Sequence, residues 1–156
     1  MKDLRKFIAT TIREYLNENI SSNIWYRGYT TNTKNNDYVW ITSNERHAKQ
    51  YADINKYSYG GNPIVDKFEF DENNHNLNYL YSYDMDDMVS ENDIEDFLTD
   101  VKIEYDYDDL FDVMEDEIPL SRVVNKILDE LVQNYDGIKI MENEIKTIYI
   151  KNQLLK

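Results

Sequence analysis

Apolar residues recur along this chain at two different spacings, and each spacing predicts a different kind of element. Over residues 3–18 they fall every three or four positions with charges between them, which indicates an amphipathic helix packed against a core. The same spacing predicts a helix over residues 44–59, with Tyr51 on its buried stripe, ending before the Gly-Gly-Asn-Pro cluster at 60–63. A further helix should run from Pro119 to about residue 134, because proline suits a first helical turn.

Runs of β-branched and aromatic residues predict strands instead. Such runs cover residues 24–29, 38–42 and 64–70, and polar or turn-forming segments separate them. After the Asp-Gly turn at 136–137, two more strands should follow and end near residue 155. Helices and strands mixed in this order predict an α+β fold.

Length and composition predict one domain over residues 1–156, since 41% apolar residues in 156 are enough for one core and short for two. The chain has no cysteine, so it offers neither a disulfide framework nor a thiolate metal site. No apolar run reaches the roughly 20 residues that cross a bilayer. Charges interrupt the N-terminal segment, unlike a signal peptide. We therefore expect a soluble, cytoplasmic protein with no membrane partner.

The formal charge of -14 is concentrated in one segment. Residues 84–117 contain 16 acidic residues and one basic residue, Lys102, so this insertion carries 1 - 16 = -15 and the remainder about +1. Ile94, Phe97 and Leu98 lie at helical spacing there, which predicts short helices; Val101, Leu110, Phe111 and Met114 continue the pattern. The segment could simply aid solubility, dock a basic partner, or mimic DNA, and direct nucleic-acid binding is not expected. It lacks the spacing and central glycine of a calcium loop.

Two glutamates stand one residue apart at the bend of the predicted C-terminal hairpin. Because side chains alternate across a strand, Glu142 and Glu144 should point the same way. Like charges placed together cost free energy unless a site uses them. The pair is therefore a candidate for chemistry, although an exposed turn residue and a solvated glutamate are the plain alternatives.

The spacing resembles the Glu-x-Glu signature that leads into the catalytic strand of mono-ADP-ribosyltransferases of the Arg-Ser-Glu class. That class places an arginine on its first strand and a Ser-Thr-Ser element on its second. Arg27 and the run Val39-Trp40-Ile41-Thr42-Ser43 supply these in the same order, with Ile41 where the first serine would stand. Small phage-encoded relatives use a tyrosine on the following helix, a place that Tyr51 could fill. The matching segments are residues 24–57 and 135–155.

The resemblance implies a split β-sandwich around an NAD cleft, with helices outside. In such a site Glu144 would hydrogen-bond the ribose 2-hydroxyl as positive charge develops, and Glu142 would orient or deprotonate an arginine acceptor. Arg27 would hold the NAD pyrophosphate or ribose. Thr42 and Ser43 would hold Glu144 in place, and Tyr51 would stack on nicotinamide.

Each of these residues also has a structural interpretation. Arg27 could form a salt bridge with the acidic segment, Ser43 could cap the following helix, and Tyr51 could pack in the core. The chain has no glycine-rich phosphate loop, and we assign no role to His47 or His75.

The resulting hypothesis is a mono-ADP-ribosyltransferase that uses NAD and modifies a protein, most simply at arginine. The leading helix over residues 1–20 resembles those of some phage proteins, and an Asn-, Lys-, Ile- and Tyr-rich composition suggests an AT-rich genome; a phage source would make a host protein the target. An NAD glycohydrolase is the nearest variant. The alternative of another class is a non-catalytic acidic protein that binds a basic or nucleic-acid-binding partner.

Overall fold

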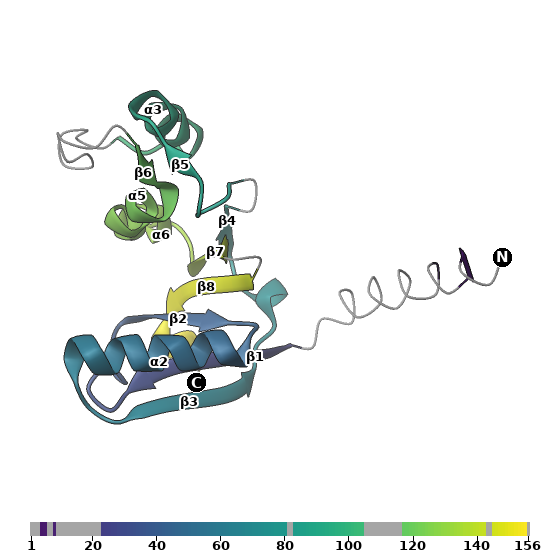
Figure 1. Cartoon of the computed structure of the whole chain (residues 1–156), viewed down its shortest axis with the longest axis vertical. Coiled ribbons are helices and arrows are strands. Elements are labelled where there is room, and N and C mark those ends of the chain that lie inside the picture. Colours follow the sequence, from purple (N-terminus) through teal and green to yellow (C-terminus); the bar gives the residue numbers. More distant parts are fainter. Residues whose placement is uncertain are drawn as a thin grey trace.

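A six-stranded sheet forms the centre of the computed structural model, which describes residues 4, 5, 8, 23–80, 83–104, 117–142 and 145–155. The strand order is β3-β1-β2-β8-β7-β4, antiparallel except for the β4–β7 pair (Figure 1). The strands are β1 Ile24–Thr30, β2 Tyr38–Thr42, β3 Pro63–Glu69, β4 Leu77–Tyr79, β7 Gly137–Glu142 and β8 Ile145–Lys151. A second, two-stranded sheet pairs β5 (Met88–Val89) with β6 (Ile118–Pro119). The predicted α+β class is confirmed.

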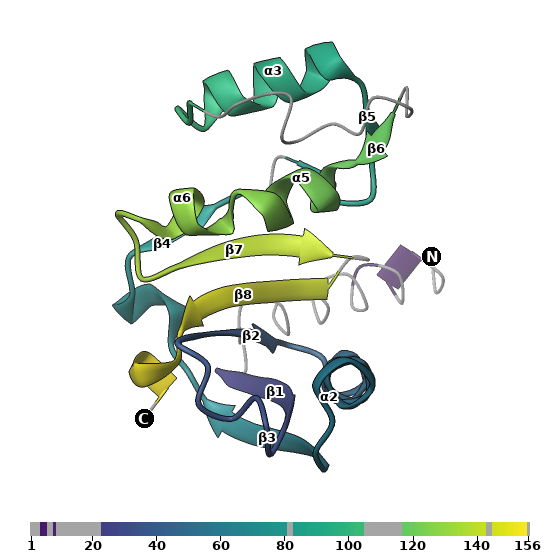
Figure 2. The ribbon, with the colours of Figure 1, turned by 90° about the vertical axis from the view of Figure 1, so that its left-hand side faces the viewer.

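Helix α2 (Glu45–Tyr59) covers one face of β1 and β3 (Figure 2). Its N-cap is Asn44, whose side chain accepts the His47 N–H. The prediction that Ser43 caps this helix is therefore wrong: the Ser43 hydroxyl donates to the Lys146 carbonyl at 3.4 Å. The helix ends as predicted at the glycine pair, where Gly60 has a φ of 70°.

Helices α5 (Leu120–Lys126) and α6 (Leu128–Val132) pack beside β7, and α3 (Glu91–Asp100) lies beyond them (Figure 2). The single helix predicted from Pro119 is interrupted at Ile127, where φ is -112° and ψ is 20°. Pro119 is the N-cap of α5 and lies outside the first turn. These helices share one apolar cluster with β7: Leu80, Met85, Ile94, Phe97, Leu98, Ile118, Leu120, Val123, Val124, Ile127, Leu131, Val132, Ile138 and Ile140.

The other face of the sheet has its own apolar cluster, made of Trp25, Val39, Ile41, Phe70, Leu77, Ile148 and Ile150. Two short 3-10 helices, η1 (Glu72–Asn74) and η2 (Asn152–Leu155), follow β3 and β8. The C-terminal residues predicted to end a strand therefore lie in η2. Figure 2 places η2 on the opposite side of the sheet from α2. One face of the sheet is thus covered by helices, and the other carries the second apolar cluster and η2.

Several predictions concern residues that the structure describes only in part. Leu4, Arg5 and Ile8 are helical, but Leu4 and Ile8 are 57% and 47% exposed, so these two do not pack in the core as predicted. The remaining positions of the N-terminal helix, and Leu110, Phe111 and Met114, lie outside the described residues. Within the part of the chain that the structure describes, no helix is both long and apolar enough to span a bilayer.

Candidate functional site

The two candidate catalytic glutamates belong to the segment that joins β7 to β8. Glu142 is the last residue of β7, and its backbone is paired with Ile145. Glu144 lies outside the described residues. Just after this segment, the carbonyl of Lys146 accepts from the Ser43 backbone N–H at 3.1 Å and from the Ser43 hydroxyl at 3.4 Å. Ser43 therefore ties the end of β2 to the first residues of β8.

Thr42 is fully buried on the face that α2 covers. Its Oγ1 accepts the Asn44 N–H at 3.2 Å and lies 3.4 Å from His47 Nδ1. On β8, Thr147 pairs with Thr42, and its Oγ1 has no hydrogen-bond partner among the described residues. A buried hydroxyl without a partner lowers the stability of the fold. The unsatisfied Oγ1 of Thr147 lies two residues after the start of β8.

Tyr51 lies on α2, half-buried, with its ring 4.5 Å from the ring of His47. It lines a cavity of about 120 Å³ together with Trp40, Ser121 and Asn125. The structure therefore places Tyr51 and Thr42 on the same face, with buried His47 between helix and strand. Sequence reasoning gave His47 no role, and nothing in its local pattern indicated this position.

Arg27 lies on the opposite face and is 8% exposed. Nη1 donates to Asn152 Oδ1 at 3.1 Å, and Nη2 donates to the carbonyls of Thr33 and Lys34 at 3.3 and 2.9 Å. The guanidinium also stacks over the Tyr29 ring at 4.4 Å. Burial lowers the pKa of Arg27, and the nearby Tyr29 and Asp66 oppose that shift. No salt bridge to the acidic segment occurs among the described residues.

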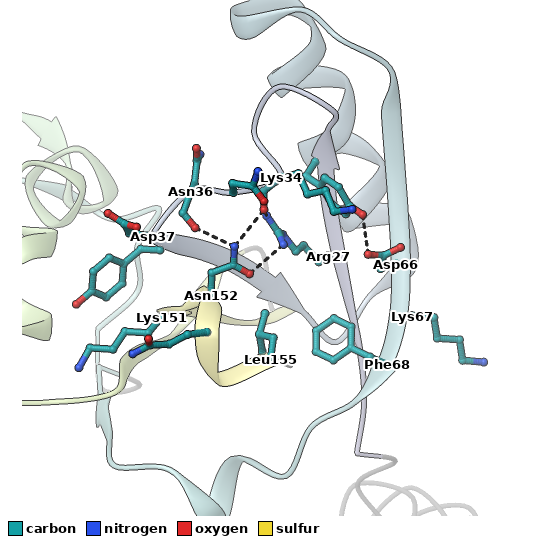
Figure 3. A pocket seen from close by; sticks show the side chains of 14 residues that line it. Arg27, Lys34, Asn36, Asp37, Asp66, Lys67, Phe68, Lys151, Asn152 and Leu155 are labelled. Carbon is teal, nitrogen blue, oxygen red and sulfur yellow. Dashed lines mark hydrogen bonds between the residues drawn. The ribbon is translucent and has the colours of Figure 1, made fainter.

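Around Arg27 the molecule has a cavity of about 780 Å³ (Figure 3). The Tyr29 hydroxyl donates to Asp66 Oδ2 at 2.8 Å on its wall. Burial raises the pKa of Tyr29, and its hydrogen bond to Asp66 adds to the shift. Asn152 is a wall residue that the sequence gave no reason to choose, since it lies 125 positions from Arg27.

The structure therefore divides the predicted site residues into separate groups. Thr42 lies under α2 and Tyr51 belongs to α2, Ser43 holds the start of β8, and Arg27 faces the large cavity on the other side of the sheet. The predicted role of Arg27 as an NAD ligand stays a prediction.

Lys139 of β7 is a buried cation on the same face as Arg27, 2% exposed and paired with Glu72. Burial lowers its pKa to about 8, and nearby Lys146 acts in the same direction. Burial also raises the pKa of Glu72. The pair joins η1 to β7, which is a structural role.

The described part of the acidic insertion is a solvent-exposed lobe around α3. Its ten described carboxylate residues are all exposed: Asp84, Asp86, Asp87, Glu91, Asp93, Glu95, Asp96, Asp100, Glu104 and Glu117. Across the described ranges, no group of three or more histidine, aspartate or glutamate side chains could hold a metal ion.

Comparison with known proteins finds no matching family model, no matching curated protein and no matching solved structure.

Proposed function

We propose that this protein is a mono-ADP-ribosyltransferase that takes NAD as its substrate and modifies a protein side chain, with arginine as the favoured acceptor. The observation that supports this proposal is the pairing of β2, which lies between β1 and β8 in the sheet. Three motifs that are far apart in the sequence thus belong to neighbouring strands: Arg27 on β1, Thr42-Ser43 at the end of β2, and Glu142-x-Glu144 before β8. Thr42-Ser43 and the segment before β8 meet at the same end of these strands, whereas Arg27 faces the other side of the sheet.

The contacts of Ser43 add to this support. Both its N–H and its hydroxyl donate to the Lys146 carbonyl, two residues after Glu144. A catalytic carboxylate must be held by groups that are themselves fixed, and Ser43 fixes the backbone that follows it. In this proposal Ser43 is a positioning residue, which acts through β8 and does not contact the substrate.

The proposed reaction breaks the bond between the ribose C1 and the nicotinamide nitrogen, and the bonding electrons leave with nicotinamide. Positive charge then develops on the ribose, as in glycoside hydrolysis. The Glu144 carboxylate would accept a hydrogen bond from the ribose 2-hydroxyl that strengthens as this charge grows. Such differential stabilisation lowers the barrier by several kcal/mol in related chemistry.

The acceptor nitrogen then forms the new bond to ribose C1. An arginine guanidinium is protonated at neutral pH and carries no free electron pair for attack. Glu142 would take the proton that the nitrogen loses as the new bond forms, which is general base catalysis. This requirement for a second carboxylate is why arginine is the favoured acceptor.

The direct test is incubation of the protein with labelled NAD and a cell lysate, beside Glu144→Gln and a control, Glu69→Gln. Glu69 is exposed at the end of β3, so the control makes the same chemical change outside both the 142–144 segment and the acidic lobe. We expect labelled protein with the native chain and the control, and a loss of about 100-fold or more with Glu144→Gln. Glu142→Gln should retain NAD hydrolysis but lose transfer to protein.

Equal labelling by the Glu144 and Glu69 variants would exclude the proposed catalytic role. Free ADP-ribose without labelled protein would support an NAD glycohydrolase. If several lysates give no NAD consumption, the transferase proposal fails.

A second candidate function, binding of a basic partner, is supported by the exposed lobe around α3. Lys102 is the single cation among the described residues of that lobe. If the lobe selects the transferase target, changing Glu91, Glu95 and Asp96 to their amides should abolish labelling of that target and spare NAD hydrolysis. Equal loss of both activities would contradict target selection.

A further inference from the structure

The outer edge of β3 is open. β3 lies at one end of the strand order and, among the described strands, pairs only with β1. The Phe70 N–H donates to the Asn23 carbonyl at 2.7 Å, and hydrogen-bonded pairs alternate along an antiparallel ladder, so the even-numbered residues of β3 bond to β1. The backbone groups of Val65, Lys67 and Glu69 therefore point away from the sheet, and they have no hydrogen-bond partner among the described residues. Such a row of unpaired groups is a template for another strand.

The described elements leave this edge uncovered. α2 packs on one face of β3, and Figures 1 and 2 both place β3 at the margin of the molecule, with no labelled element beyond it. β4, the strand at the other end of the sheet, has three residues, whereas β3 has seven. A very short edge strand offers few hydrogen bonds to a partner. β3 is therefore the edge at which a further strand gains more hydrogen bonds.

The charges on β3 suit a copy of the same strand. Lys67 and Glu69 are both exposed and lie two positions apart, so they share one face of the strand and carry opposite charges. In Figure 3, Lys67 points outward, away from the cavity. Charged side chains on an edge strand ordinarily discourage pairing. An antiparallel copy, however, can place each of these two side chains opposite the other, so that the charges attract.

The acidic lobe around α3 limits where a second copy can bind. The net charge of -14 lies almost entirely in residues 84–117. Figure 1 shows α3 and β3 at opposite ends of the long axis of the molecule. Repulsion between exposed charges is largely screened beyond a Debye length of about 8–10 Å. A second copy that binds at β3 keeps the two lobes far apart, so the net charge does not oppose association there.

We propose that two copies of this chain form a symmetric dimer in which their β3 strands pair antiparallel and join the two sheets into one. A twofold axis normal to the sheet keeps each face on its own side, so it passes between two copies of the same residue. An axis at Phe68 places Lys67 of each copy opposite Glu69 of the other. An axis at Asp66, Lys67 or Glu69 places like charges opposite each other. An axis nearer Pro63 loses hydrogen bonds, since proline has no N–H. The charges therefore select the axis at Phe68.

Sedimentation equilibrium of the full chain over about 1–500 µM tests the dimer. We expect the apparent mass to rise with concentration from that of one chain towards that of two. The mass of one chain at every concentration would refute the proposal. β1 and β2 separate β3 from β8, and sedimentation follows association alone, so this proposal and the transferase proposal can fail independently.

Charge reversal tests the pairing. Lys67→Glu and Glu69→Lys should each weaken association about tenfold or more, because each creates contacts between like charges in both halves of the dimer. The double variant has the same two charges in exchanged positions and should regain the association of the native chain. Lys102→Glu, the same charge change in the acidic lobe, should leave association unchanged. Equal weakening by Lys67→Glu and Lys102→Glu, or no recovery in the double variant, would overturn the pairing.

The chain has no cysteine, so a single introduced cysteine reports which residues meet. In the proposed dimer Phe68 faces its own copy in a non-hydrogen-bonded pair, where Cα atoms lie about 4.5 Å apart, within the range of a disulfide. Phe68→Cys should therefore give a disulfide-linked dimer on mild oxidation. Ile64→Cys, four positions earlier on the same face, should not cross-link, because its two copies would lie about 26 Å apart. Cross-linking of both variants to the same extent would overturn the register.

Discussion

The close approach of α2 to β1 makes Gly28 the most sensitive position next to Arg27. A Cβ atom added at Gly28 would lie 1.7 Å from the Ala48 carbonyl oxygen, 2.7 Å from its carbonyl carbon and 2.9 Å from the Ala52 nitrogen. Ordinary contacts between such atoms are about 3.5 Å. Gly28→Ala therefore requires α2 to move away from β1 by about 1.5 Å or more.

This displacement affects the most tightly packed side of α2, where Ala48 and Ala52 are 0% and 1% exposed. A gap of that size forfeits at least half of the dispersion energy across the contact. Alanine in a strand regains about 0.5–1 kcal/mol relative to glycine, which does not offset the loss. We expect Gly28→Ala to lower the free energy of unfolding by about 3–5 kcal/mol, a large part of a typical total.

Urea denaturation followed by the fluorescence of Trp25 and Trp40 measures this change. Gly60→Ala is the matched control, because its nearest contact is 3.5 Å from a side-chain atom of Asn32 and only its φ of 70° opposes substitution. It should cost about 1–2 kcal/mol.

The clash is with backbone atoms, so removing the Ala48 side chain should not relieve it. Gly28→Ala combined with Ala48→Gly should be at least as unstable as Gly28→Ala alone, because glycine also weakens the helix by about 1 kcal/mol. Recovery of stability in this double variant would refute the reasoning. A loss for Gly28→Ala no larger than for Gly60→Ala would refute it as well.

Three further predictions concern titrating groups and a helix cap. Burial lowers the pKa of Lys139 to about 8, below its ordinary 10.5, so between these two pH values the unfolded chain binds more protons than the folded one. The free energy of unfolding of the unmodified protein should therefore rise relative to that of Lys139→Met as pH rises through this window, by up to about 3 kcal/mol, and urea titrations measure this change. The hydrogen bond from Tyr83 to Asp100, 2.6 Å long, is the main reason that the pKa of Tyr83 is raised to about 12, so Asp100→Asn should make this phenol ionise at lower pH in an ultraviolet absorbance titration. Asn44→Ala should cost about 1 kcal/mol of unfolding free energy and Ser43→Ala less, because the amide of Asn44 caps α2; the opposite order in urea denaturation would contradict that cap.

The candidate site was only partly predictable from sequence. The order of the motif residues gave Arg27, Thr42, Ser43, Tyr51 and the two glutamates, but sequence order does not say which face of a sheet a residue occupies. The structure places Thr42 under α2 and Arg27 on the other face. The contact of Arg27 with Asn152 joins positions 125 residues apart, and no local pattern encodes it.

The sequence by itself determined the local elements. Helical spacing gave α2 and α3, and the strands β1, β2, β3, β7 and β8 followed from β-branched and aromatic runs between turn residues. These signals are local, because the spacing of apolar residues indicates only that one side of a segment will be buried. Tertiary structure decided which elements pack against that side. It also decided the position of β8 between β2 and β7 and the interruption of the helix at Ile127. It also chose Asn44 over Ser43 as the cap, since Ser43 bonds to a β8 carbonyl that is distant in sequence. Partners of this kind are selected by the packing of the whole chain, so only the folded molecule contains them.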